Sequence, residues 1–145
     1  MKSDLGCIFC KIVERTAEAS VVYEDERIIA FMTLRPLNPG EFLVIPKEHI
    51  DHFCEVPDDL SCHLITQVQR LSRNLRARLK PQRVGLVVHG YGVPHAHLVV
   101  VPLHDSSDIV SAKHAYIEDG EVKYSEKLLP EVPRAELDRL AQILS

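Results

Sequence analysis

The sequence predicts an α+β fold in which helices pack on an antiparallel sheet. Short apolar runs bounded by turn residues lie on both sides of one long segment with helical periodicity, an order typical of that class. The 145 residues are 46% apolar, and they contain no internal repeat and no Gly- or Ser-rich linker. We therefore expect residues 1–145 to form a single domain.

The first third of the chain is expected to supply a short helix and three strands. Residues 7–15 favour the helix because apolar side chains fall on one side of it. Residues 21–23 and 28–32 predict a hairpin around an acidic turn, and residues 42–45 predict a third strand that ends at Pro46.

The middle of the chain predicts a long amphipathic helix over residues 58–80. Asp58 and Asp59 suit a helix N-terminus, while Lys80 and Pro81 mark its end. Apolar residues recur every three or four positions and define the buried face, namely Leu60, Leu64, Val68, Leu71, Leu75 and Leu79. The other face carries arginines that we interpret as solvated, namely Arg70, Arg73, Arg76 and Arg78.

Two further strands and a C-terminal helix complete the expected fold. Residues 84–88 and 95–101 are rich in valine and lie on either side of a glycine-containing turn, which is typical of paired strands. Residues 133–144 favour a helix with Pro133 near its start.

The charge and the N-terminal sequence limit the classes of function. The formal net charge of −4 argues against a non-specific nucleic-acid binder, which would need a basic surface. No apolar run has the length of a signal peptide or a membrane span. We therefore expect a cytoplasmic protein with reduced cysteines, a small ligand, and neither nucleic acid nor membrane as partner.

Residues 90–102 form the most informative stretch because two histidines stand two apart in an apolar run. If the run is a strand, His95, His97 and Val99 point to the same face. The preceding turn, from Gly90 to Gly92, offers backbone N–H groups that can hold an anion. This arrangement indicates a nucleophile that attacks phosphorus.

A second group of residues indicates a metal site. Cys7 and Cys10 have the spacing usual for two thiolates on one zinc ion, and His49 and His95 follow or begin strands and are candidates for the other two ligands. The alternatives are that the two cysteines are small buried hydrophobic residues or a redox pair. Cys54 and Cys62 have no such spacing and are interpreted as packing residues.

Taken in order, these segments resemble the histidine triad family of nucleotide hydrolases and transferases. The matching segments run from about residue 7 to about residue 102, namely residues 7–13, 22–25, 29–31, 36–49 and 90–102. The resemblance implies a five-stranded antiparallel sheet with one long helix and one or two shorter ones. It also implies a homodimer in which the sheet continues across the two-fold axis, with a nucleotide site in each subunit.

The resemblance also assigns roles to residues. His97 corresponds to the histidine that attacks the α-phosphorus of a nucleoside phosphoramidate or a dinucleoside polyphosphate and forms a nucleotidyl-histidine intermediate, and His95 corresponds to the first histidine of the motif. The implied purine nucleotide would be held by Phe9, Ile12, Phe31, Met32, Thr33, Leu34, Gly90, Tyr91, Gly92 and Val93.

Three positions depart from the family pattern and bear on the rate. Val99 stands where the third histidine belongs, Thr33 where many relatives have an aspartate for the ribose, and Gly92 where a serine is common. Loss of one hydrogen-bond donor to a reacting group typically costs about 10²- to 10³-fold in rate, so we expect slow turnover. The alternatives are a nucleotide-binding or scaffold protein without turnover, or an enzyme for a different phosphorylated substrate.

The resemblance extends to zinc. Some bacterial members of the family bind it through residues that correspond to Cys7, Cys10, His49 and His95, which implies a closed, structural site. The alternative for His95 is an unliganded histidine that shapes the pocket. Surface or packing roles are expected for the remaining histidines, namely His52, His63, His89, His104 and His114.

Overall fold

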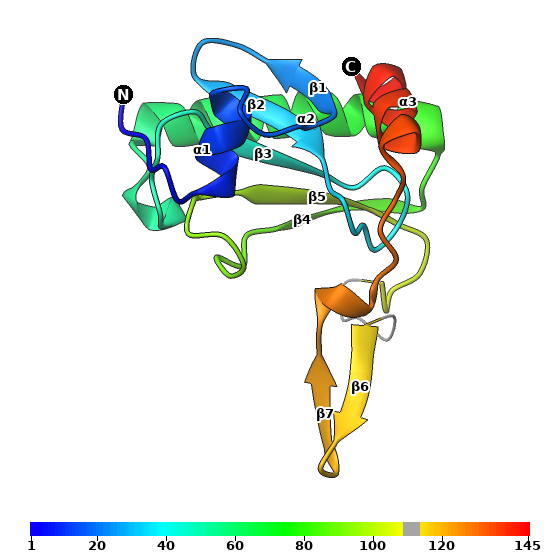
Figure 1. The fold of residues 1–145 in the computed structure, drawn as a ribbon. Helices are drawn as coiled ribbons and strands as arrows, with labels where there is room; N and C mark the ends of the chain where they lie inside the picture. The colour runs from blue at the N-terminus through cyan, green and yellow to red at the C-terminus, as the bar shows by residue number, and fades with distance from the viewer. Residues whose placement is uncertain (109–113) are drawn as a thin grey trace.

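The structure is a computed structural model that describes residues 1–108 and 114–145. The described residues form a five-stranded antiparallel sheet in the order β1-β2-β3-β5-β4, which confirms the predicted α+β class (Figure 1). Its strands are β1 (Val21–Glu24), β2 (Ile28–Met32), β3 (Phe42–Pro46), β4 (Arg83–Val87) and β5 (Leu98–Leu103).

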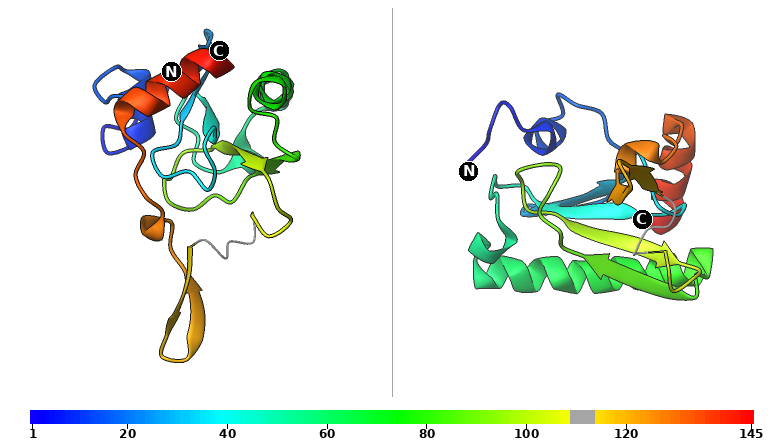
Figure 2. Two further views of the ribbon diagram at one scale, coloured as in Figure 1. Left: turned by 90° about the vertical axis from the view of Figure 1, so that its right-hand side faces the viewer. Right: turned by 90° about the horizontal axis from the view of Figure 1, so that it is seen from below.

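Helices cover both faces of this sheet. The long helix α2 (Asp58–Leu79) packs on one face, and the short helix α1 (Ile8–Val13) packs on the other (Figure 2). The C-terminal helix α3 (Arg134–Leu144) contributes apolar side chains to the same core cluster as α2. Single 3₁₀ turns lie at Phe53–Glu55 and Glu126–Leu128. Among the described residues, no helix has both the length and the apolar character needed to cross a bilayer.

Strand β2 shows why the sheet has two buried faces. Ile28, Ala30 and Met32 belong to the core cluster with α2 and α3, whereas Ile29 and Phe31 belong to the smaller cluster around α1. Because alternate residues of a strand point to opposite faces, a strand covered on both sides must be apolar throughout. This explains why residues 28–32 form an unbroken apolar run rather than an alternating one.

Helix α2 agrees with its prediction to within one residue. Its apolar face is buried, its first turn carries Asp58 and Asp59, and Lys80 ends it in the left-handed conformation with φ 51°. Gly40 approaches the end of the helix so closely that a Cβ there would lie 2.4 Å from Cδ1 of Leu79. A larger residue here would displace the Leu79 side chain, and φ of +102° also favours glycine at this position in the loop between β2 and β3.

Strand β5 begins later than predicted, at Leu98 rather than at His95. The backbone N–H of His95 bonds to the carbonyl of Val93, and that of Ala96 to the carbonyl of Ile50, so neither joins the ladder. The predicted alternation survives in this extended segment, because Ala96 and Leu98 belong to the core beneath α2 while His97 lies on the opposite face.

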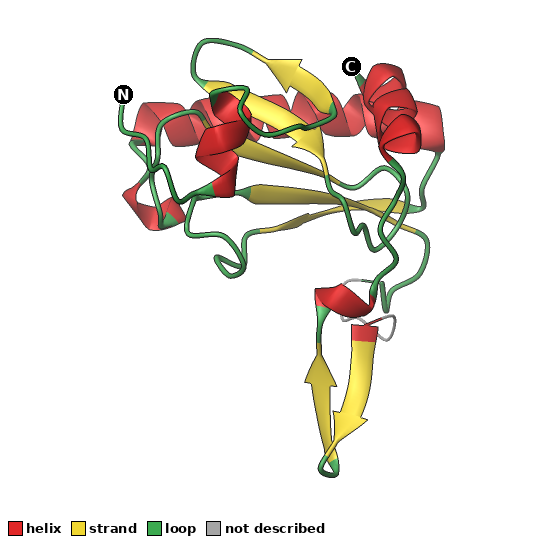
Figure 3. Cartoon of the chain, in the orientation of Figure 1, coloured by secondary structure: helices red, strands yellow, loops and turns green. Residues whose placement is uncertain are grey.

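A second, two-stranded sheet was not predicted. Strands β6 (Ala115–Glu118) and β7 (Glu121–Tyr124) form a hairpin that projects from the five-stranded sheet (Figures 1 and 3). Asp119 and Gly120, with φ 52° and 76°, make its turn. An Asp-Gly pair flanked by β-forming residues is a strong hairpin signal that was available in the sequence.

Asp25 holds the turn between β1 and β2 against helix α2. Its carboxylate accepts hydrogen bonds from the backbone N–H groups of Arg27 (2.8 Å) and Ile28 (3.0 Å), from the hydroxyl of Tyr23 (2.8 Å) and from Nε2 of His63 (2.7 Å). Burial alone would raise the pKa of Asp25, but these hydrogen bonds together hold it well below its ordinary range. The carboxylate therefore stabilises the folded state.

Replacing Asp25 with alanine is expected to lower the free energy of unfolding by about 1–3 kcal/mol at pH 7 because several hydrogen bonds to a charged acceptor are lost. The folded pKa lies below the unfolded value of about 3.9, so the contribution is complete above that pH and fades as the pH falls toward the folded pKa. Urea unfolding at pH 7 and pH 3 measures both effects.

The matched control is Asp59→Ala. Asp59 accepts a hydrogen bond from Arg27 at 2.8 Å, but its side chain is 73% exposed, so the change should stay within about 0.5 kcal/mol. Equal losses for the two variants at pH 7 would contradict the role given to Asp25.

Candidate functional site

The four predicted metal ligands come together at one point between α1 and the sheet. Cys7 precedes the first turn of α1 and Cys10 lies within it, His49 follows β3, and His95 precedes β5. One ligand atom from each residue lies within 4.8 Å of all the others. Cys7, Cys10 and His95 are buried, so the cluster lies inside the protein.

The spacing within this cluster fits a tetrahedral zinc ion. With Zn–S near 2.3 Å and Zn–N near 2.0–2.1 Å, tetrahedral angles place S and N about 3.6 Å apart. Nδ1 of His95 lies 3.5 Å from Sγ of Cys7 and 3.6 Å from Sγ of Cys10, and Nδ1 of His49 lies 3.3 Å from Sγ of Cys10. The four side chains thus have the donor set and the spacing of a closed Cys₂His₂ zinc site.

The surroundings of His95 prepare its Nδ1 for a metal. Its Nε2 lies 2.8 Å from the carbonyl oxygen of Pro46, and a carbonyl only accepts, so Nε2 carries the hydrogen and Nδ1 keeps a lone pair. Burial lowers the pKa of His95, which favours the neutral ring. Burial also raises the pKa of the Cys7 thiol, so metal binding at this site must release a proton.

His97 is oriented by its neighbour. Its Nδ1 lies 2.7 Å from the carbonyl oxygen of His95 and must donate to it, which leaves the lone pair on Nε2. The edge of the imidazole also meets the ring of Phe9, with centroids 5.5 Å apart. His97 is therefore held in the tautomer that a nucleophile requires.

His97 opens into a cavity of about 210 Å³ on the α1 side of the sheet. A second cavity of about 370 Å³ adjoins it, and the two share Phe9, Thr33, Arg35, Leu43 and Val93 in their walls. Together they have the size of an ordinary small-molecule site.

Most of the predicted nucleotide-binding residues line these cavities. Phe9, Ile12, Phe31, Met32, Thr33, Leu34 and Val93 border the larger one, and Phe9, Thr33, Tyr91, Gly92 and Val93 border the smaller one. Met32 packs with the core beneath α2, on the face of β2 opposite to Phe31, so the two cannot present their side chains to one ligand. Gly90 borders neither cavity in the described structure and lies exposed in the turn.

Val99 lines the smaller cavity together with His97, as expected for the position of the third histidine. Other residues that line this cavity were not predicted to do so. His89 and His114, for which surface or packing roles were expected, line it as well. The other additions are Arg35, Leu37, Glu41, Leu43, Val87, Val101 and Leu129. His114 and Leu129 come from the chain beyond β5, and no local sequence pattern links them to His97.

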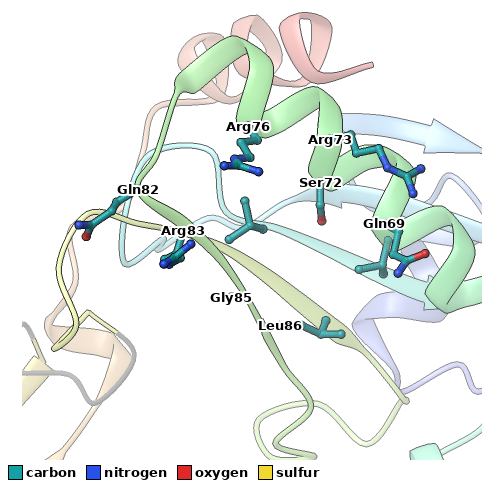
Figure 4. Close-up of a pocket in the computed structure, with 10 residues that line it drawn as sticks. Gln69, Ser72, Arg73, Arg76, Gln82, Arg83, Gly85 and Leu86 are labelled. Atoms are coloured by element: carbon teal, nitrogen blue, oxygen red, sulfur yellow. The ribbon is translucent and has the colours of Figure 1, made fainter.

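A separate groove of about 400 Å³ lies between α2 and β4, on the other face of the sheet from His97 (Figure 4). Arg73 and Arg76 of α2 and Arg83 of β4 line it together with polar side chains. Two of the arginines interpreted as solvated thus face a groove. The residues that line this groove include Ser72 but no histidine that could act as its base, so the candidate site is assigned to the His97 cavity.

The chain matches known proteins over most of its length. Residues 14–106 match the sequence model of the HIT domain. An uncharacterized HIT-like protein of Methanocaldococcus jannaschii is 37% identical over 122 residues, covering 81% of this chain and 89% of the relative. The protein named hit of Bacillus subtilis is 32% identical over 108 residues, covering 71% of this chain and 74% of the relative.

Solved structures agree with the fold. A zinc-bound histidine triad family protein of Mycobacterium smegmatis superposes with a TM-score of 0.74 at 27% identity, covering 97% of this chain and 94% of that one. A HIT family member of Bacillus subtilis has a TM-score of 0.67 at 32% identity, with coverages of 73% and 79%. A Hit-like protein of Bartonella henselae, at 22% identity and a TM-score of 0.75, shares the fold over 97% of this chain and 95% of its own.

Zinc should purify with the protein at about one equivalent per chain, and Cys10→Ser should lose it because a closed site needs all four ligands. A zinc concentration 1,000-fold above the dissociation constant stabilises the folded state by about 4 kcal/mol, so the variant should unfold at a clearly lower temperature. Elemental analysis and thermal unfolding measure the two effects.

Cys54→Ser is the control for this pair of measurements. Cys54 is a free, exposed cysteine, so its loss should leave zinc content unchanged and stability within about 0.5 kcal/mol. Wild-type protein from zinc-replete medium that carries less than about one tenth of an equivalent would rule out the site.

Proposed function

The chain belongs to the HIT domain family, and from this premise we propose that it is a nucleotide-binding hydrolase whose nucleophile is His97. Its substrate is a nucleoside phosphoramidate or a dinucleoside polyphosphate, cleaved at the α-phosphorus. The observation that carries the proposal is the hydrogen bond of 2.7 Å from Nδ1 of His97 to the carbonyl of His95, which leaves Nε2 free to attack in a cavity.

The reaction proceeds in two displacements. Nε2 of His97 attacks phosphorus and expels the leaving group, and water then hydrolyses the nucleotidyl-histidine intermediate. His95 is a positioning residue, because its carbonyl fixes the tautomer of His97 while its ring faces the metal ligands. The proposed nucleophile, His97, and the metal ligand, His95, are thus two residues apart in one extended segment.

The nucleotide is proposed to occupy both cavities. Phe9, Ile12 and Phe31 give the larger cavity an apolar wall suited to a purine base. Thr33 borders both cavities and is proposed to contact the ribose, at the position where many relatives have an aspartate. The turn at Gly92, where φ is +90°, is proposed to present backbone N–H groups to the phosphate.

Zinc is proposed to have a structural role. Cys7, Cys10, His49 and His95 supply four protein ligands, which leaves no open position for substrate. The ion therefore braces the N-terminal segment against the segment that carries His97. The zinc-bound relative of Mycobacterium smegmatis supports this proposal. The reduced cysteines that the site requires agree with the predicted cytoplasmic location.

A homodimer is proposed across the free edge of β4. Within the described residues β4 is the last strand of the sheet, and its Leu86 is 44% exposed. An exposed edge strand is a ready template for pairing with another copy. The arginine-lined groove in Figure 4 borders this edge, so like charges from two copies would meet there and make the association sensitive to salt.

The second candidate function is nucleotide binding without turnover, as in a scaffold protein. Val99 favours it, because a valine in the wall beside His97 cannot donate a hydrogen bond to the leaving group. Tight binding of a nucleotide in calorimetry, with no product under single-turnover conditions, would establish this alternative.

His97→Ala is expected to abolish hydrolysis of aminoacyl-adenylate analogues and diadenosine polyphosphates because it removes the nucleophile. Trapping of a nucleotidyl adduct by acid-free denaturation and mass spectrometry should label the wild type at His97 and leave the variant unlabelled. His52→Ala is the control, since the His52 side chain is 67% exposed and lies outside both cavities. Equal residual rates in wild type and His97→Ala would refute the catalytic proposal.

A further inference from the structure

Two residues in the wall of the His97 cavity each contain a polar side-chain atom without a hydrogen-bond partner. Among the described residues, Oγ1 of Thr33 and Nδ1 of His114 are the buried side-chain atoms without a hydrogen-bond partner. Both residues line the cavity that contains His97. Buried polar groups are nearly always paired, so these two residues of the cavity wall each keep unused hydrogen-bonding capacity.

The position of His114 is set by contacts on both sides of it. Its carbonyl accepts a hydrogen bond of 3.0 Å from the backbone N–H of Ser125, and its ring meets the ring of Tyr124 edge-on at 6.0 Å between centroids. These contacts fix His114 at the base of the β6–β7 hairpin.

The chain that follows the hairpin is bonded to the loop between β2 and β3. Arg35 donates to the carbonyl of Leu129 at 2.9 Å, and the backbone N–H of Val132 donates to the carbonyl of Leu34 at 2.9 Å. Leu129 and His114 both line the cavity, so the hairpin and the chain that follows it each supply a residue to its wall.

The site has a need that His114 can meet. Expulsion of an amine from phosphorus requires a proton, and Val99 offers none at the position of the third histidine. We propose that His114, which lies outside residues 14–106 that match the HIT domain, is the general acid that protonates the leaving group in the reaction of His97. This inference rests on the proposed hydrolase function.

Each bond and proton in the proposed reaction is accounted for. The Nε2 lone pair of His97 forms a bond to phosphorus while the bond from phosphorus to the amine breaks, and the amine nitrogen keeps the electron pair and takes a proton from the ring of His114. Water then attacks phosphorus, the bond to His97 breaks with its electron pair returning to the imidazole, and the ring of His114 recovers a proton from the water. The products are the free amine and a nucleoside monophosphate.

The competing candidate is His89. It lines the same cavity, but it is exposed and its ring lies against Tyr91 at 4.9 Å between centroids. An exposed imidazole that already packs against a neighbour is a poorer match to a shielded leaving group than the less exposed ring of His114.

The test compares two leaving groups. In a nucleoside phosphoramidate of an alkyl amine, the departing amine must be protonated. In the p-nitrophenyl ester of the same nucleotide, nitrophenolate departs as a stable anion without a proton. His114→Ala should lower kcat for the phosphoramidate by about 10²- to 10⁴-fold, the range for loss of general acid catalysis, with KM little changed. Its kcat for the nitrophenyl ester should stay within about threefold of wild type, which also shows that the variant is folded.

A rescue variant sharpens the result. Val99→His in the His114→Ala background places an imidazole beside His97 and should restore most of the lost phosphoramidate rate. Val122→Ala is the control for the hairpin, since Val122 is 60% exposed on β7 and lies outside the cavity, and it should match wild type on both substrates.

The outcomes separate this inference from the proposed function. The role of His114 would be overturned if His114→Ala lowered kcat equally for both substrates, or did not lower it for the phosphoramidate. It would also be overturned if His89→Ala, rather than His114→Ala, lowered kcat for the phosphoramidate alone. Retention of nitrophenyl ester hydrolysis by His97→Ala, or no turnover by wild type on either substrate, would overturn the hydrolase itself and the inference with it.

Discussion

The site depends on one fully buried imidazole, that of His95. Its Nε2 hydrogen bonds to Pro46 at the end of β3, its Nδ1 faces Cys7 and Cys10, and its carbonyl orients His97. A single residue therefore connects the sheet, the metal ligands and the nucleophile. The ring of His95 serves the metal ligands and the end of β3, whereas its backbone carbonyl sets the tautomer and the direction of His97.

The two faces of the sheet have separate tasks. The α2 face carries the large apolar cluster, which excludes water and contributes most of the hydrophobic stability. The α1 face carries the metal ligands and the cavities, and it packs only a small apolar cluster around Phe9 and Phe31. Polar side chains can thus be buried on one face without weakening the packing on the other.

Sequence periodicity was sufficient to locate the regular helices and strands. It was insufficient where contacts between residues distant in the sequence determine the path of the chain. The apolar face of α2 and the unbroken run of β2 could be located because burial imposes a period on them. The start of β5 could not, because Ala96 bonds to Ile50, a residue far away in the sequence. The convergence of His49 and His95 on the cysteines was expected only from the family resemblance. The place of His114 depends on how Leu129 and Val132 meet residues 34 and 35, which no local pattern encodes.

The hydrogen bonds of Leu129 and Val132 to residues 35 and 34 have a consequence for the proposed reaction. The proposed nucleophile, its orienting carbonyl and the metal ligands all lie in residues 7–97, while His114 and Leu129 supply another part of the cavity wall. The part of the cavity proposed to meet the departing group is therefore built from a separate stretch of chain. Under this proposal, replacing that stretch would alter which leaving group departs most readily and would leave the attacking side intact.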